Sequence, residues 1–225
     1  MRDVRVYLEG GGTGKEQKAE LRRGFDDLFG REKSHASEKR RGLAFICCGG
    51  RQEAYEAFRN AIDVHPERIN ALLIDSEAPI APVPADRSKD ARLRRDHLLR
   101  AEAGGGRRQG DGWQLTRVAP DCIHLMVQCM EAWIVADPEA LEEFYKQGFR
   151  KARLPQRNNL EEEPKADIFE KLDSASEGSK KGKYAKINHA SKLLAMIDPE
   201  KVVRRCPRFS IFRDWLTQQI EGTAA

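Results

Sequence analysis

The sequence predicts an α/β fold in which a mostly parallel, four-stranded sheet lies between layers of helices. Residues 42–48 and 70–75 are continuous apolar runs, which are typical of parallel strands buried on both faces. These runs alternate along the chain with stretches of helical period, and that alternation favours parallel strands joined by helices. The two observations together indicate a three-layer arrangement.

The predicted elements follow in the order strand, helix, strand, helix, strand. Three glycines, Gly10 to Gly12, end the first strand, and Gly49 and Gly50 end the second. A fourth strand follows after a long insert. If the first strand lies between the second and third, the carboxyl ends of strands 1 and 3 are neighbours. Strands are expected at residues 4–8, 42–48, 70–75 and 122–129, with helices at 15–29 and after Gly50.

A basic insert at residues 78–120 separates the third and fourth strands. It holds several prolines, a basic helical stretch and the segment GGGRRQGDG, and connections of this length are typically functional or mobile. The pattern after the fourth strand is helical, with a flexible basic loop expected at 177–186. We therefore expect an α/β core at 1–137 and a helical C-terminal region at 138–225 packed on it.

The composition is typical of a globular protein. The chain has 225 residues, 40% hydrophobic and 34% charged, and a formal net charge of +4, so only local basic patches could favour nucleic-acid binding. Five cysteines without a C-x-x-C pair lie mostly in apolar runs and indicate buried, reduced thiols. With no signal peptide and no apolar run of about 20 residues, we expect a cytoplasmic protein that does not enter membranes.

The stretch VYLEGGGTGKEQ at residues 6–17 resembles a nucleotide-binding P-loop only superficially. When Gly14 and Lys15 are aligned with the G-K of the P-loop pattern, Glu9 falls on the first glycine position. Glu16 falls on the Ser/Thr position, so the hydroxyl that binds Mg²⁺ is missing. The stretch therefore predicts no nucleotide cofactor, and Glu9 becomes the residue of interest.

Three carboxylates follow the ends of neighbouring strands. Glu9 ends the first strand, and Asp75 and Glu77 follow the third. In an extended segment Asp75 and Glu77 point the same way, with Ser76 turned aside. A divalent cation would relieve the repulsion among them, and oxygen ligands favour Mg²⁺, Mn²⁺ or Ca²⁺ over zinc. The alternative is that each acid is an ordinary strand-end or turn residue.

The chain resembles the Toprim family, and more narrowly a family of small stand-alone Toprim-like proteins. A Glu-Gly pair that closes the first strand and an apolar strand that ends in D-x-D or D-x-E are the Toprim pattern. The resemblance extends over nearly the whole chain and rests on four phrases in order: YLEGGGTGKEQKAELRRGF, LLIDSEAPI, HLMVQCMEAWIVADPEAL and KYAKINHASKLLAMIDPEKVVRRCPRF.

The resemblance implies a Rossmann-like Toprim fold and roles for the acids. By motif position, Glu9 is a general acid/base or metal ligand, and Asp75 and Glu77 bind Mg²⁺ or Mn²⁺. This chain has D-S-E where the family has a second aspartate, which puts the preferred metal in doubt. Topoisomerases add a catalytic tyrosine from another domain and primases add template-binding modules, and neither is found here.

The function that the resemblance implies is metal-dependent hydrolysis of phosphodiester bonds in DNA or RNA. It also implies an ABC- or AAA-type ATPase partner and a role in anti-phage defence or repair. Two alternatives remain open. The chain is a non-catalytic nucleic-acid-binding or ATPase-partner module on the same scaffold, or it is a phosphatase or phosphotransferase acting on small nucleotides.

Further residues have both a functional and an ordinary interpretation. Glu131, just after the fourth strand, is a candidate metal ligand or an exposed acid at a helix start. Asp137, before Pro138, is expected to be a helix cap. Trp133 is expected to lie in the core, and so is His124, with its hydrogen bonds satisfied.

Basic residues on either side of the acids are candidate phosphate contacts. The alternatives are a solvated loop and, for Lys15, an ion pair with Glu16 or Glu20. The phosphate candidates are Lys15, Lys165, Lys180, Lys181, Lys183, Lys186 and His189, and a second basic set comprises Arg92, Arg94, Arg95, Arg107 and Arg108.

Overall fold

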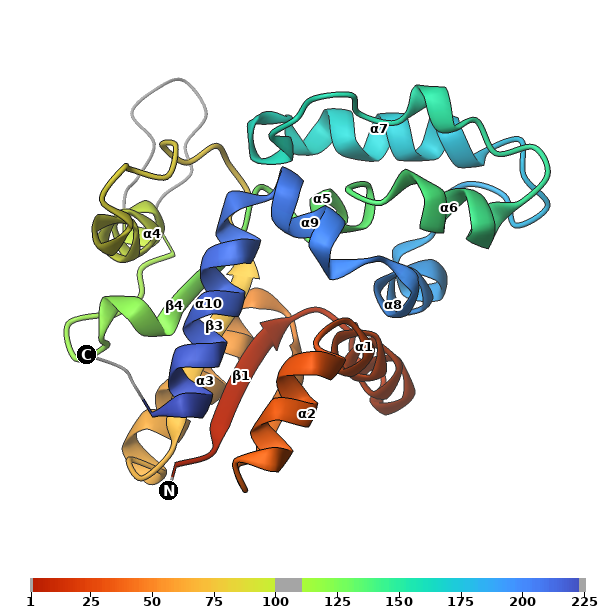
Figure 1. The fold of residues 1–225 in the computed structure, drawn as a ribbon. Helices are drawn as coiled ribbons and strands as arrows, with labels where there is room; N and C mark the ends of the chain where they lie inside the picture. Colours follow the sequence, from red (N-terminus) through yellow and green to blue (C-terminus); the bar gives the residue numbers. More distant parts are fainter. Residues whose placement is uncertain (1, 100–110, 223–225) are drawn as a thin grey trace.

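The computed structural model describes residues 2–99 and 111–222. Within them, four parallel strands form one sheet in the order β2-β1-β3-β4, with helices on both faces (Figure 1). The predicted α/β fold with a parallel sheet, and β1 between β2 and β3, is confirmed. Arg107 and Arg108 of the predicted basic set lie outside the described residues.

The elements have the following bounds. The strands are β1 (Val4–Glu9), β2 (Leu43–Gly49), β3 (Ile69–Asp75) and β4 (Ile123–Met126). The helices are α1 (Lys15–Leu28), α2 (Gly30–Glu38), α3 (Arg51–Val64), α4 (Asp90–Leu99), α5 (Glu131–Ile134), α6 (Pro138–Tyr145), α7 (Lys165–Ser176), α8 (Lys186–Met196), α9 (Pro199–Arg205) and α10 (Pro207–Glu221). Short 3₁₀ turns are η1 (Arg87–Lys89), η2 (Pro120–Cys122), η3 (Lys151–Arg153) and η4 (Leu160–Glu162).

Alternate residues of each central strand face opposite layers of helices. Val6 and Leu8 of β1 belong to the hydrophobic cluster that contains residues of α1, α2 and α10. Tyr7, between them, belongs to the cluster on the other face, with residues of α3 and α4. Because both faces are covered, the strands are apolar throughout, which is why continuous apolar runs identified them.

The fourth strand is shorter than the sequence predicts. It ends at Met126, although the apolar run continues to residue 129. After Met126 the chain bends and forms hydrogen bonds with the loop that follows β3. The amides of Ser76 and Glu77 in that loop donate to the carbonyls of Met126 and Gln128, at 3.0 Å each. The apolar residues after Met126 are therefore buried in a turn and not in a strand.

Helix α2 is not predicted from the sequence because its apolar face is nearly absent. Its only buried residues are Glu32 and Ala36. Glu32 Oε1 accepts a hydrogen bond from Arg213 Nε of α10 at 2.7 Å. An ion pair to a distant helix therefore helps to hold α2, and no local period reveals such a contact.

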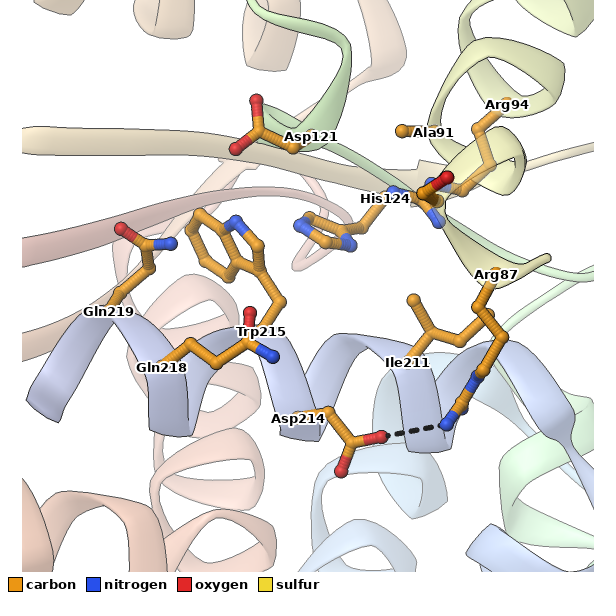
Figure 2. Close-up of a pocket in the computed structure, with 11 residues that line it drawn as sticks. Arg87, Ala91, Arg94, Asp121, His124, Ile211, Asp214, Trp215, Gln218 and Gln219 are labelled. Atoms are coloured by element: carbon orange, nitrogen blue, oxygen red, sulfur yellow. Dashed lines mark hydrogen bonds and ion pairs between the residues drawn. The ribbon is translucent and has the colours of Figure 1, made fainter. Parts of the chain in front are cut away.

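His124 lies on the edge strand β4, against α10 (Figure 2). It is 2% exposed, and its ring packs against Trp215 and Phe212 with centroid separations of 4.7 and 4.8 Å. Burial, together with the charge of Arg94, lowers the pKa of His124 well below its ordinary value, and a hydrogen bond to the Asp121 backbone offsets this only in part. The imidazole is therefore a neutral core group, as expected, but its hydrogen bonds are not all satisfied, because Nε2 has no partner among residues 2–99 and 111–222.

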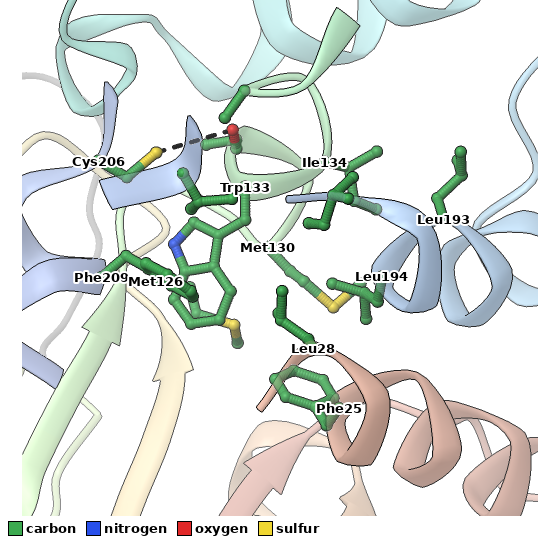
Figure 3. Close-up of a cluster of buried hydrophobic side chains, with 14 of the residues drawn as sticks. Phe25, Leu28, Met126, Met130, Trp133, Ile134, Leu193, Leu194, Cys206 and Phe209 are labelled. Carbon is green, nitrogen blue, oxygen red and sulfur yellow. Dashed lines mark hydrogen bonds between the residues drawn. The ribbon is translucent and has the colours of Figure 1, made fainter. Parts of the chain in front are cut away.

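One hydrophobic cluster joins the sheet to the C-terminal helices (Figure 3). Trp133 of α5 is 1% exposed and packs edge-on against Phe209 of α10, with ring centroids 4.7 Å apart. Phe25 of α1 and Leu194 of α8 belong to the same cluster. The prediction that Trp133 is a core residue is confirmed. The predicted boundary after residue 137, between the α/β core and the helical C-terminal region, stays a prediction. The cluster contains residues from both sides of this boundary.

Helices α5 to α8 lie beyond the carboxyl ends of the strands (Figure 1). The close packing of α8 on α1 helps to hold them there. A Cβ added to Gly24 of α1 would lie 2.5 Å from the carbonyl oxygen of Ser191 on α8, so the two backbones meet without a side chain between them. This packing brings Lys186, the first residue of α8, to the sheet edge.

Two further expectations concern the thiols and the membrane. All five cysteines lie in the described residues and are free thiols, with Cys129 and Cys206 buried and the others half-buried. Among residues 2–99 and 111–222, no helix has the length and apolar character needed to span a membrane. The cytoplasmic location stays a prediction.

Gly24→Ala should destabilise the protein because the added methyl group collides with the α8 backbone. Overpacking of this kind costs about 1–3 kcal/mol, measured as the free energy of unfolding in urea. Gly30→Ala in α2 is the matched control, since no described atom outside its immediate neighbours lies within 4 Å of the new Cβ. Equal stability of Gly24→Ala and wild type would show that α1 and α8 do not pack as described.

His124 should make the protein lose stability in mild acid. The unfolded chain takes up a proton below the ordinary pKa of 6.5, whereas the buried imidazole does not. The stabilising contribution is complete above that pH and falls by about 1.4 kcal/mol per pH unit below it, until the folded pKa is reached. The measurement is urea unfolding at several pH values, and His124→Gln should show a shallower slope. Equal slopes for wild type and His124→Gln would contradict the lowered pKa of His124 in the folded protein.

Candidate active site

The end of β1 places Glu9 at the carboxyl edge of the sheet. Leu8 pairs in register with Leu73 of β3, so the residues that follow in both strands emerge at the same edge. Gly10 has a φ of 123° and forms reciprocal backbone hydrogen bonds with Gly49 at 2.6 and 3.0 Å. A side chain at Gly10 would also collide with Leu21. The glycines therefore let the chain turn away sharply after Glu9.

Arg51, the first residue of α3, binds the first acid. Its Nη1 lies 3.3 Å from Glu9 Oε2 and donates to the backbone carbonyl of Asp75 at 2.6 Å. Its Nε and Nη2 donate to the carboxylate of Asp111 at 2.9 and 2.8 Å. Arg51 thus connects the ends of β1 and β3, and sequence reasoning missed it. Its position directly after Gly49-Gly50, at the same sheet edge, is the signal that could have identified it.

Asp75 is the most buried of the three predicted acids, with 3% of its surface exposed. Its Oδ1 accepts a hydrogen bond from the Met130 amide at 2.8 Å. Its Oδ2 lies 3.7 Å from Lys165 Nζ and 3.9 Å from Lys186 Nζ. Burial raises the pKa of Asp75 to about 7; the charges of Lys186 and Lys165 lower it, and those of Glu131 and Glu9 raise it. Loss of hydration therefore makes Asp75 hard to ionise, although two ammonium groups lie nearby.

Glu77 shares a lysine with Asp75 although it does not lie in an extended segment. Its φ is 64°, so the assumption that residues 75 and 77 point the same way because the chain is extended was wrong. Both carboxylate oxygens of Glu77 accept from Lys165 Nζ at 2.7 Å. Lys165 begins α7, and its amide donates to Gln128 Oε1 at 3.2 Å. Ser76 is turned aside as expected, with its hydroxyl donating to Ala78 O at 2.8 Å.

Glu131, at the start of α5, is a fourth carboxylate at this edge. It is completely buried, so the alternative of an exposed acid was wrong. Its Oε1 accepts from the Tyr184 hydroxyl at 3.0 Å and lies 3.2 Å from Lys186 Nζ. Tyr184 comes from the loop that we expected to be flexible, yet it is only 9% exposed. Burial and the Glu131 charge raise the pKa of Tyr184, so its hydroxyl stays protonated and donates.

Most of the other predicted phosphate contacts are not brought to the acids. Lys181 Nζ lies 4.3 Å from the ring centroid of Phe144, and Lys183 Nζ lies 3.4 Å from Glu177. His189 is buried, and its Nδ1 is 3.0 Å from the Tyr145 hydroxyl.

Lys15 and Lys180 are exposed, and no contact between them and the acids occurs within residues 2–99 and 111–222. In the second basic set, Arg94 is buried in an ion pair with Asp90, which corrects its assignment as a phosphate contact. Asp137 caps α6, as expected, by accepting from the Ala140 amide at 3.2 Å.

A cavity of about 350 Å³ opens beside the acids. Its wall consists of the glycine turn after Glu9, Gln17 and Leu21 of α1, Met130 and the first half of α8. Lys186 lines this cavity and its Nζ also contacts Glu131, so this residue connects the cavity wall to the carboxylates. Ile187, on the same wall, is 56% exposed and offers an apolar surface.

The carboxylates suit a divalent cation only if the lysines move. Among residues 2–99 and 111–222, no three Asp, Glu, His or Cys side chains meet at metal-binding distance. Lys165 instead lies between Asp75 and Glu77, and Lys186 lies between Asp75 and Glu131. Each ammonium group occupies the position of a cation between oxygen ligands. An all-carboxylate donor set fits Mg²⁺ or Mn²⁺, provided that these lysines turn away.

Comparison with known proteins identifies a family and no described activity. No curated protein and no solved structure matches the chain. Residues 8–217 match the family described as Domain of unknown function (DUF4276), and the match includes the glycine turn, all four carboxylates and both lysines that contact them. Because the match extends over most of the sequence, the chain belongs to the DUF4276 family.

Proposed function

We propose that this protein is a metal-dependent nuclease that hydrolyses phosphodiester bonds in DNA or RNA. One observation carries the proposal. Four carboxylates from three segments, Glu9, Asp75, Glu77 and Glu131, gather at one edge of a parallel sheet; two lysines lie between the last three, and Arg51 contacts Glu9. Such a concentration of acids is costly in a structural role and is typical of sites that bind divalent metal and phosphate.

Asp75, Glu77 and Glu131 would hold Mg²⁺ or Mn²⁺, with Glu9 as a further ligand or the general base. The metal would neutralise the attacked phosphate and supply hydroxide at neutral pH. Arg51 orients Glu9 by binding its carboxylate while fixing the backbone at Asp75. The raised pKa of Asp75 supports the proposal, because burial keeps this carboxyl group from ionising and a bound divalent cation would offset that loss of hydration.

Lys165 and Lys186 would act on the substrate phosphate. Both ammonium groups contact carboxylates at the site, and their side chains remain 29% and 45% exposed. When a cation binds the carboxylates, the ammonium groups are released toward solvent and can donate to non-bridging phosphate oxygens. The cavity beside Lys186 would receive the sugar and base next to the scissile bond, with Ile187 as an apolar contact.

A non-catalytic module is the second candidate function, and one observation favours it. The carboxylates are already paired with Lys165, Lys186 and Arg51, as they would be in a purely structural ion network. In that case the surface binds nucleic acid or an ATPase partner without cleavage. The ATPase partner and the role in anti-phage defence or repair are proposals that rest on the resemblance to Toprim-like proteins.

Lys165→Met should strengthen Mn²⁺ binding, whereas Asp75→Asn should weaken it. The lysine competes with the metal for Asp75 and Glu77, and removing one such charge changes affinity by about tenfold or more. Titration calorimetry with Mn²⁺ measures both effects. Lys192→Met, at an exposed position of α8, is the control and should bind as wild type does. If wild type, Lys165→Met and Asp75→Asn bind Mn²⁺ equally, the carboxylates do not form the metal site.

Glu9→Gln and Asp75→Asn should each reduce cleavage of labelled DNA or RNA in Mn²⁺ by at least about a hundredfold. Glu170→Gln on α7, an exposed acid, should retain full activity. The measurement is the initial rate on single- and double-stranded oligonucleotides. If cleavage survives both Glu9→Gln and Asp75→Asn, the carboxylates at this sheet edge are not the catalytic site. Phosphate release from mononucleotides, with polynucleotides intact, would indicate a small-nucleotide phosphatase instead.

A further inference from the structure

The end of the insert between β3 and β4 is fastened to α3 beside the carboxylates. Trp113 stacks on Tyr55 of α3, with ring centroids 4.4 Å apart and ring planes inclined by 2°. The indole Nε1 of Trp113 donates to Gln52 Oε1, also on α3, at 2.8 Å. These contacts place Asp111, just before Trp113, next to Arg51 at the start of the same helix. The proposed nuclease function assigns no role to Asp111.

Asp111 and Glu9 share one guanidinium group unequally. The Asp111 carboxylate accepts from Nε and Nη2 of Arg51 at 2.9 and 2.8 Å, the two parallel hydrogen bonds that make an arginine–carboxylate pair strong. Glu9 has a single contact with Arg51, from Nη1 at 3.3 Å, and Nη1 also donates to the Asp75 carbonyl at 2.6 Å. The face of the guanidinium lies 5.3 Å from the Trp113 ring centroid. Arg51 is therefore held on its Asp111 side and reaches Glu9 through one nitrogen only.

The charge balance at this point depends on Asp111. The side chains of Arg51 and Asp111 are only 16% and 18% exposed, so water screens their charges weakly. Without the Asp111 charge, Glu9 is the carboxylate that remains in contact with Arg51 among residues 2–99 and 111–222. Because arginine favours a bidentate carboxylate partner, the freed guanidinium would bind Glu9 with both of its free nitrogens. Such a pair would neutralise Glu9 and repel a divalent cation from the carboxylates.

We propose that Asp111 is a positioning residue that keeps Arg51 from neutralising Glu9. By occupying Nε and Nη2 and balancing the guanidinium charge, Asp111 leaves the Glu9 carboxylate available to a divalent cation or as a general base. The inference rests on the proposed function, since it concerns a metal bound at the carboxylates. It assigns to the insert one definite contribution to the site, made through Arg51 and without contact with the metal or the substrate.

The test is calorimetric titration of Asp111→Asn with Mn²⁺. This substitution removes the charge while nearly keeping the shape of the side chain, and Mn²⁺ affinity should fall by about tenfold or more, because Arg51 then repels the cation and binds Glu9. Asp214→Asn is the matched control. Asp214 also pairs with an arginine, since its Oδ2 lies 3.2 Å from Arg87 Nη1, but this pair joins α10 to η1 and has no contact with the carboxylates. Asp214→Asn should bind Mn²⁺ as wild type does.

A second substitution separates positioning from a purely structural role. Asp111→Asn combined with Arg51→Gln removes both charges, and the glutamine can still donate to the Asp75 carbonyl. This double variant should regain Mn²⁺ affinity to within about threefold of wild type, whereas a structural role for Asp111 predicts that the second change weakens binding further. Asp111→Glu, which keeps the charge, should also bind within about threefold of wild type. Urea unfolding of each variant shows that it is folded.

Three results would overturn the proposal: Asp111→Asn binds Mn²⁺ as wild type does, the double variant binds no better than Asp111→Asn, or Asp111→Glu binds as weakly as Asp111→Asn. Each of these leaves the proposed metal site in place, because wild type still binds Mn²⁺. If wild type itself binds no Mn²⁺, the metal site is refuted, and the role of Asp111 is refuted with it.

Discussion

Four carboxylates kept close together, of which Asp75 and Glu131 are buried, are the constraint on which the rest of this structure depends. Parallel pairing of β1 with β3 makes Glu9 and Asp75 neighbours, and the turn after β4 adds Glu131. Their mutual repulsion and lost hydration have to be offset by positive charge. Lys165 and Lys186 supply that charge from α7 and α8. The helical C-terminal region therefore lies over the sheet edge as a source of counter-charge.

The position of those lysines depends on packing at a distance from them. Close contact of α1 with α8 at Gly24 carries the start of α8 to the acids, and the cluster around Trp133 holds α5 against the sheet. Arg208 of α10 adds a buried ionic link, with its guanidinium 2.8 Å from Asp90 and 2.9 Å from Glu161. Because breaking a buried pair leaves an uncompensated charge, this link resists separation of α10 from α4.

The cavity beside the acids and a second cavity, between α10, α4 and β4, differ in chemistry but share a connection (Figure 2). One adjoins Lys186 and the carboxylates, whereas the wall of the other includes His124 and Trp215 beside Arg87 and Asp214, which pair with each other. Helix α4 lines the second cavity and also reaches the acids, since His97 Nε2 lies 2.8 Å from the Ser76 carbonyl oxygen. Ser76 separates Asp75 from Glu77, so a single helix contacts both regions of the molecule.

The sequence by itself determined the parallel sheet, the acids at its strand ends and the helical character of the C-terminal region. These follow from apolar runs, glycine breaks and helical period, which are local properties. Only the tertiary structure decided that Lys165 and Lys186 meet the acids while Lys181 contacts Phe144, that Arg51 binds Glu9, and that β4 ends early. Lys165 and Glu77 are 88 residues apart, and their meeting depends on how α7 is held above the sheet, which no local pattern encodes.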